Sequence, residues 1–63
     1  MCLSTAYKNE KKPENAIASN IMMVDIDGDR IVLVDLFGIR TVVEGSLKRA
    51  NLTEGYIILN TKE

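Results

Sequence analysis

Residues 20–36 read NIMMVDIDGDRIVLVDL, and this stretch decides the fold. Two runs rich in Ile, Val, Leu and Met flank an Asp-Gly pair. This arrangement is typical of a β-hairpin, because glycine adopts the positive φ of a tight turn without steric cost. We therefore predict strands over 20–26 and 30–36, joined by a turn over 27–29.

Glycines also separate the other apolar runs of the chain. Gly38, Gly45 and Gly55 lie between short segments rich in Val, Ile and Leu. A spacing of about ten residues between such breaks is typical of strands joined by turns. We predict further strands over 39–44 and 56–60, with Gly45 ending the first of them.

The remaining segments are less regular. Residues 2–7 alternate weakly and are predicted to form a first strand, whereas the charged, proline-containing segment 8–15 predicts an exposed loop. Residues 46–52 fit either a helical turn with Ser46 as its N-cap or a bulged strand, which we prefer. The predicted fold class is all-β. We expect one domain over residues 1–63, a small antiparallel barrel-like sheet of about six short strands, SH3-like in size.

A domain of this size needs additional support. The chain has 63 residues, and a domain of about 60 residues buries only about 60% of the surface that its unfolded chain exposes. Such domains often rely on a disulfide, a metal or a partner chain, and a single cysteine excludes an internal disulfide. The predicted strands over 30–36 and 56–60 carry apolar side chains on both faces. In a strand with one face in water, apolar and polar residues would alternate along the chain. Closure of the barrel covers one face of these strands. We expect a second subunit in a homodimer to cover the other face; the alternative is that loops of the same chain fold over it.

Composition narrows the function. The net charge is −1 and the 8 Lys and Arg residues are spread along the chain, which argues against nucleic-acid binding driven by phosphate neutralisation. There is no histidine, so a Ser-His catalytic pair within the chain is excluded, and we expect no enzyme. Residues 25–29 resemble the start of a calcium loop. However, the glycine comes too early, and Leu36 stands where such a loop ends in glutamate.

The chain carries no recognisable membrane or export signal. No apolar run approaches the roughly 20 residues of a membrane helix, and no basic start is followed by an apolar stretch. One free thiol without a disulfide fits a reducing compartment. We expect a cytoplasmic protein without a membrane partner.

The one cysteine, Cys2, is the best candidate for chemistry because it lies beside the α-amine. That amine titrates near pH 8, so it can be deprotonated to bind a metal. If Met1 is retained, the amine, the Cys2 backbone nitrogen and the Cys2 thiolate form adjacent chelate rings. If Met1 is removed, the amine and thiolate of Cys2 form one ring. Nitrogen and sulfur donors suit square-planar Ni(II), and thiolates also suit Zn(II) and Cu(I). One chain supplies too few donors, so two chain starts would have to meet. The alternative is that Cys2 is simply a small buried apolar residue.

Several short motifs carry a family resemblance. The chain opens with Met-Cys-Leu and continues with Leu-Phe-Gly at 36–38, Val-Glu-Gly at 43–45 and Tyr-Ile-Ile-Leu at 56–59. In this order and spacing the motifs resemble the CooT family of small nickel-binding proteins, associated with maturation of nickel-containing carbon monoxide dehydrogenase. The resemblance implies a homodimer in which Cys2 binds Ni(II) where the chains meet, with Met1 or the free amine as its accessory. It also implies a metallochaperone-like carrier or store, with a nickel enzyme or its maturation machinery as partner.

The chain departs from the family pattern on its surface. Ile39 stands where charged residues are common, and Lys48-Arg49 where a further apolar residue is common. The family has also carried a predicted RNA-binding label. The alternative function is therefore a small β-barrel module that binds RNA or protein and has no metal role. A basic face with exposed aromatic residues would favour it.

Overall fold

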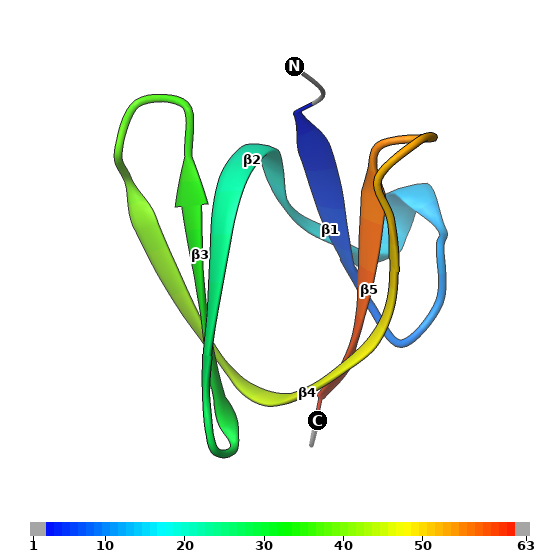
Figure 1. The fold of residues 1–63 in the computed structure, drawn as a ribbon. Helices are drawn as coiled ribbons and strands as arrows, with labels where there is room; N and C mark the ends of the chain where they lie inside the picture. Colours follow the sequence, from blue (N-terminus) through cyan, green and yellow to red (C-terminus); the bar gives the residue numbers. More distant parts are fainter. Residues whose placement is uncertain (1–2, 62–63) are drawn as a thin grey trace.

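The computed structural model describes residues 3–61, which form a closed barrel of five strands and one short 3-10 helix (Figure 1). The elements are β1 (Ser4–Lys8), η1 (Pro13–Asn15), β2 (Ala16–Asp27), β3 (Arg30–Asp35), β4 (Arg40–Asn51) and β5 (Tyr56–Thr61). Neighbours along the barrel pair antiparallel, except β1 and β5, which pair parallel. The predicted all-β, barrel-like fold class is confirmed.

The Asp-Gly hairpin forms as predicted. β2 and β3 pair from Asp27 and Arg30 inward, and Gly28 takes a φ of 62° in the turn between them. β2 begins earlier than predicted, at Ala16, because its first half pairs with β1. The predicted loop is observed over residues 9–15, with the 3-10 helix at its end, whereas Lys8 belongs to β1.

Gly45 does not end a strand, and this prediction is wrong. It lies inside β4, where its φ is 154° and an added Cβ would overlap the backbone carbonyl oxygen of Asn60 in β5. The glycine therefore permits close approach of two backbones, and two predicted strands merge into one. The helical alternative for residues 46–52 is also wrong. The preferred bulged strand is observed as far as Asn51, with a register shift between Leu47 and Arg49.

The two long strands, β2 and β4, close the barrel by changing partners along their length. β2 pairs with β1 up to Ile21 and with β3 from Ile21 onward. β4 pairs with β3 up to Glu44 and with β5 from Gly45 onward. Each strand therefore belongs to two sheets and curves between them (Figure 1). Among residues 3–61, no strand pairs with the second edge of β2 beyond Ile21.

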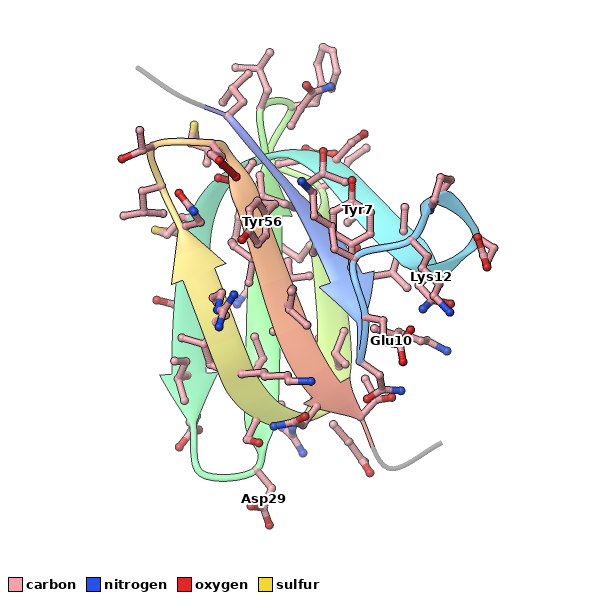
Figure 2. All side chains as sticks on the ribbon, turned by 90° about the vertical axis from the view of Figure 1, so that its right-hand side faces the viewer. Tyr7, Glu10, Lys12, Asp29 and Tyr56 are labelled. Carbon is pink, nitrogen blue, oxygen red and sulfur yellow. The ribbon has the colours of Figure 1, made fainter. Side chains whose placement is uncertain are left out.

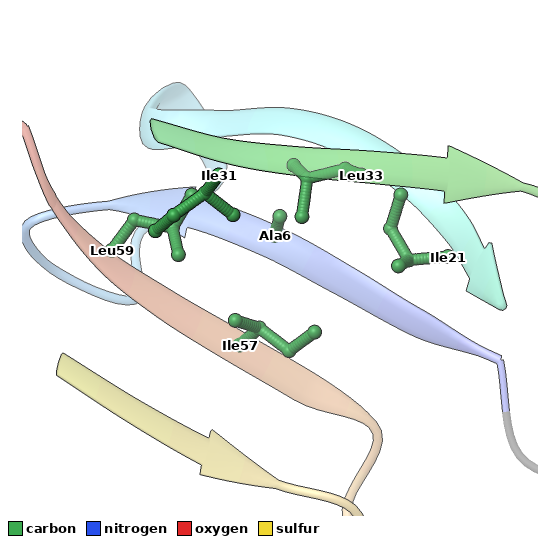
Figure 3. Close-up of a cluster of buried hydrophobic side chains, with 6 residues drawn as sticks. All are labelled: Ala6, Ile21, Ile31, Leu33, Ile57 and Leu59. Atoms are coloured by element: carbon green, nitrogen blue, oxygen red, sulfur yellow. The ribbon is translucent and has the colours of Figure 1, made fainter. Parts of the chain in front are cut away.

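The core lies between these sheets and draws on β1, β2, β3 and β5 (Figure 3). The side chains of Ile31, Leu33 and Leu59 are completely buried. The other buried members of the cluster are Ala6, Ile21 and Ile57. The strands predicted to be apolar on both faces are thus the ones that supply most of the core.

The outer face of β5 is partly covered by the chain itself. Tyr56 is only 9% exposed, and the Lys11 ammonium lies 4.4 Å from the centre of its ring. The loop between β1 and β2 therefore folds back over this part of the sheet. Cover by a folded-back loop was the alternative to cover by a second subunit. Phe37 behaves differently. β3 ends at Asp35, and Phe37 is 78% exposed in the following turn rather than on a strand.

Among the described residues there is no helix of the length and apolar character needed to cross a bilayer.

Candidate functional site

The two residues predicted to bind metal, Cys2 and Met1, lie outside the described residues 3–61. The structure instead defines the surface to which they are attached. Two residues of chain span at most about 7 Å, so the thiol of Cys2 is tied to the neighbourhood of Ser4. The burial, contacts and charge of the surface around Ser4 therefore bear on whether Cys2 can bind a metal.

The start of β1 is held firmly on both sides. Ser4 is 4% exposed and pairs with Ile21 of β2. On the other side, the backbone N–H of Thr5 donates to the carbonyl oxygen of Gly55 at 3.0 Å. Gly55 has a φ of 80°, and an added Cβ would lie 3.2 Å from the Leu3 carbonyl oxygen. The turn between β4 and β5 therefore packs directly on Leu3 and the start of β1.

Ser4 also lines a groove of about 540 Å³ between β2 and β4, which we call the β2–β4 groove. Apart from Ser4 its described lining is entirely apolar, and no charged side chain contributes to it. The apolar lining residues are Ile21, Met22, Met23, Val24, Ile26, Leu47, Ala50, Leu52 and Ile57. A surface next to the predicted metal ligand is thus shaped for apolar contact.

An irregularity in β2 supplies part of this lining. Adjacent residues of a regular strand point to opposite faces, yet Met22 and Met23 both line the groove. The register of β2 against β3 shifts between Ile21 and Met23, so the strand carries a bulge there. Bulges re-aim side chains in this way. The methionines provide adaptable, polarizable contact surface.

The described residues offer no alternative metal centre. Among residues 3–61 no three His, Cys, Asp or Glu side chains lie close enough to hold an ion together. The acidic side chains of Asp27, Asp29 and Glu44 line a shallow polar depression together with Arg30. The β2–β3 turn that carries Asp29 lies at the end of the barrel opposite the start of β1 (Figures 1 and 2). The residues that resemble a calcium loop are accounted for by the hairpin.

Charge in the loop between β1 and β2 is paired locally. The Lys12 ammonium lies 2.8 Å from a carboxylate oxygen of Glu10 (Figure 2). Its hydrogen bond and its positive charge lower the pKa of Glu10, and the same contact raises the pKa of Lys12. Both groups are exposed, so the pair contributes little to stability.

The break predicted at Gly38 is observed as a turn after β3, but the apolar surface that this turn exposes was not predicted. One carboxylate oxygen of Asp35 accepts hydrogen bonds from the backbone N–H groups of Phe37 and Ile39, each at 2.9 Å. The turn is further tied to β2, because the N–H of Leu36 donates to the Asn20 carbonyl oxygen. This ordered turn presents Leu36, Phe37 and Ile39 to solvent. The signal was an Asp followed three residues later by Gly, which is typical of a turn capped by its own side chain.

Comparison with known proteins identifies the family. The profile described as "CO dehydrogenase accessory protein CooT" matches residues 1–60, a span that includes Cys2. The chain belongs to the CooT family. Membership confirms the resemblance noted from the sequence motifs, and it places the chain in a family of accessory proteins of carbon monoxide dehydrogenase.

The fold agrees with a solved structure of that family. It is described as "Crystal structure of putative CooT from Carboxydothermus hydrogenoformans", and it matches with a TM-score of 0.82. The match covers 98% of this chain and 100% of the other, at 21% sequence identity. At that identity the likeness establishes the shared fold. No curated protein matches the chain.

Proposed function

We propose that this CooT-family chain is a nickel-binding homodimeric accessory protein that carries or stores Ni(II) for a nickel enzyme or its maturation machinery. The observation that supports this most strongly is the family match over residues 1–60, because it includes the Cys2 position. The proposed cargo is Ni(II), held by the Cys2 thiolates and N-terminal nitrogens of two chains. The chain would act as a cytoplasmic binding protein rather than an enzyme.

The chemistry of the chain start fits such a cargo. The Cys2 thiol and the α-amine must each lose a proton before they bind a metal. The two groups are joined by a short covalent path, so their binding forms a chelate ring without ordering any other part of the chain. If Met1 is retained, the backbone nitrogen of Cys2 joins the two as a third donor. Nitrogen and thiolate donors in this arrangement suit Ni(II).

The surroundings of Ser4 support a site shared by two chains. The start of β1 is fixed by Ile21 and Gly55, so the short segment before it has a defined origin. The same origin borders an apolar groove without charged lining. Two chain starts brought together there would supply twice the donors of one.

Titration of the apo protein with Ni(II) tests this proposal. We expect thiolate-to-nickel charge-transfer absorption that saturates at a fixed ratio of metal to chain. Cys2→Ser should abolish that band, whereas Met22→Leu, which removes a thioether but keeps the thiol, should retain it. Mass spectrometry of the same sample establishes whether Met1 is present. Nickel binding by Cys2→Ser as tight as that of the parent would refute the assignment.

The RNA-binding alternative gains no support from the described surface. Tyr56 is buried under Lys11, so it is not free to stack on a base. Phe37 is exposed, but its neighbours Leu36 and Ile39 are apolar rather than basic. A gel-shift assay over a range of salt concentrations decides the matter. Salt-sensitive RNA binding that survives Cys2→Ser would favour the alternative.

A further inference from the structure

The fold gathers basic side chains that are far apart in the sequence. Lys11 and Lys12 belong to the loop between β1 and β2, whereas Lys48 and Arg49 belong to β4. All four residues are exposed, and they are half of the 8 Lys and Arg residues of the chain. β5 lies between their two segments, because it pairs with β4 on one side and with β1 on the other. We call these four side chains the basic face.

A bulge in β4 and a contact across β5 place Lys48. Adjacent residues of a regular strand point to opposite faces, but the register of β4 against β5 shifts between Leu47 and Arg49. Bulges of this kind re-aim side chains. The Lys48 ammonium reaches the far side of β5, where it donates to the Asn9 carbonyl oxygen at 3.2 Å. The N–H of Asn9 donates in turn to the carbonyl oxygen of Leu59, so this bridge is tied to β5.

The outer side of β5 holds two more of the cations. Tyr56 and Ile58 alternate along β5 with two residues of the core, so their side chains point outward. Arg49 pairs with Ile58 and therefore shares its face of the sheet. The Lys11 ammonium lies over the Tyr56 ring, 4.4 Å from its centre (Figure 2). The cations of the basic face thus lie around the outer side of β5.

The chain's own Glu10 shows that this face attracts carboxylates. Its carboxylate lies 2.8 Å from the Lys12 ammonium, and the charge of Lys48 also acts on it. Both cations lower the pKa of Glu10, the hydrogen bond from Lys12 most strongly. Among residues 3–61, no carboxylate forms an ion pair with Lys11, Lys48 or Arg49. The basic face therefore retains positive charge that a further carboxylate can neutralise.

We propose that the basic face docks an acidic segment of a partner protein, whose Asp or Glu side chains pair with Lys11, Lys48 and Arg49. A guanidinium binds a carboxylate through two parallel hydrogen bonds, and ammonium groups add point charges beside it. Exposed pairs are individually weak, so several must form together, and the contact should be reversible and sensitive to salt. The proposal goes beyond the proposed function, since it requires neither nickel nor a second copy of this chain.

The distribution of charge favours an acidic partner. The chain has a net charge of −1, but the acidic residues Asp27, Asp29 and Glu44 line a depression away from the basic face, near the β2–β3 turn. Figure 2 shows Asp29 at that end of the barrel and Lys12 on the loop beside β5. An acidic segment is attracted to the basic face and repelled from the depression, so charge fixes where it docks.

A protein segment fits this face better than RNA or a bilayer. Tyr56 lies under Lys11, so its ring is not free to stack on a base. Among the described residues of β1, β5 and the loop between β1 and β2, no large apolar side chain is exposed. The face therefore offers no apolar side chain for insertion into a bilayer, which peripheral membrane binding normally adds to charge. Recognition here is between ions, as expected for a carboxylate-rich peptide.

Fluorescence anisotropy with a labelled hexaglutamate peptide at low ionic strength tests the proposal. We expect saturable binding that weakens as salt is added. Combining Lys48→Gln with Arg49→Gln should raise the dissociation constant about 3- to 10-fold, through the loss of two exposed pairs. The matched control combines Arg30→Gln with Arg40→Gln, because it removes the same charge from exposed residues where β3 and β4 pair. The control should leave binding nearly unchanged, and equal weakening by both would overturn the proposal.

A second pair of variants should tighten binding instead of weakening it, so a loss of folding cannot imitate the result. Glu10→Gln removes the carboxylate that competes for Lys12 and Lys48, and hexaglutamate should bind about 2- to 3-fold more tightly. Glu44→Gln removes the same charge at the acidic depression and should change binding much less. Equal tightening would show that only the net charge matters, and it would refute the basic face as the site.

Two competitors decide the class of partner. Oligouridine with six phosphates and vesicles containing phosphatidylserine are titrated in the same assay. Binding of either one as tight as that of hexaglutamate would refute a protein partner, and no binding of hexaglutamate would refute it as well. Nickel titration of the Lys48→Gln and Arg49→Gln double variant should match the parent, so a failure of nickel binding by Cys2 and a failure of the basic face are separate results.

Discussion

Replacing Gly45 with alanine should strongly destabilise the protein, although the change adds a single methyl group. Gly45 lies where β4 crosses from β3 to β5, and its φ is 154°. An added Cβ would overlap the Asn60 carbonyl oxygen, which belongs to the backbone and cannot rotate away. The two strands would have to separate at the point where β4 bends. Leu47 and Ala50, which follow on β4 and line the β2–β4 groove, would be disturbed with them.

The size of the effect follows from two contributions. Overpacking of this kind costs about 1–3 kcal/mol, and a non-glycine residue in an unfavourable φ region costs about 1–3 kcal/mol more. The sum is about 2–6 kcal/mol. Stability of roughly 0.05–0.15 kcal/mol per residue gives this chain about 3–9 kcal/mol in total. Gly45→Ala should therefore remove about half of the free energy of unfolding or more.

Urea denaturation followed by circular dichroism measures this loss at one fixed protein concentration. Gly28→Ala is the matched control. It also has a positive φ, 62°, but no atom lies within 4 Å of the position its Cβ would take. We expect the control to lose about 1 kcal/mol. Equal destabilisation of the two variants would show that close approach to Asn60 is not what requires glycine at position 45.

Three further predictions follow from individual contacts. Asp35→Ala should destabilise the protein by about 1–3 kcal/mol, because two backbone N–H groups lose their acceptor, whereas Asp35→Asn keeps an oxygen there; urea denaturation and hydrogen exchange at the turn compare them. Lys12→Met should raise the pKa of Glu10 toward its usual value, seen by NMR titration. The pKa of Glu10 is lower in the folded chain than in the unfolded chain. Any stability from the pair is therefore fully present above the pKa of unfolded Glu10, and it is lost as the pH falls through the pKa of folded Glu10. Unchanged Glu10 titration would contradict the contact. Nickel affinity should fall as pH drops, because the Cys2 thiol and the α-amine regain protons; a competition titration that shows no pH dependence would exclude both groups as ligands.

The local order of the chain could be predicted where short-range chemistry decides it. The Asp-Gly pair predicts a tight hairpin turn over 27–29, and a hairpin turn is observed at Gly28 and Asp29, with Asp27 as the last residue of β2. The strand over 46–52 was preferred for its pattern, and it too is observed as far as Asn51. Gly45 was misinterpreted because glycine serves both in breaks and in close contacts. Whether a glycine ends a strand or permits close backbone contact depends on the strand beside it. Beside Gly45 lies the backbone of Asn60 in β5.

One part of the candidate site could be predicted from the sequence and the other part could not. Cys2 was identified from the sequence because its chemistry depends on a covalent neighbour, the α-amine, and its role as a nickel ligand stays a prediction. The groove beside Ser4 could not be predicted, since it is built by residues from β2, β4 and β5 that are far apart in the chain. The bulge that turns Met22 and Met23 to one side breaks the alternation on which sequence reasoning depends.

The sequence by itself determined the all-β class, the hairpin at residues 27–29, the family and the choice of Cys2. Each of these depends on residues that are adjacent in the chain or on the order of short motifs. Only the tertiary structure decided that β4 runs unbroken through Gly45 and that Tyr56 is covered by the chain's own loop. It also decided that several of the exposed apolar side chains line one groove beside Ser4. The physical reason is that barrel closure selects which apolar face is buried and which edge of β2 is left unpaired, and no local pattern encodes that choice.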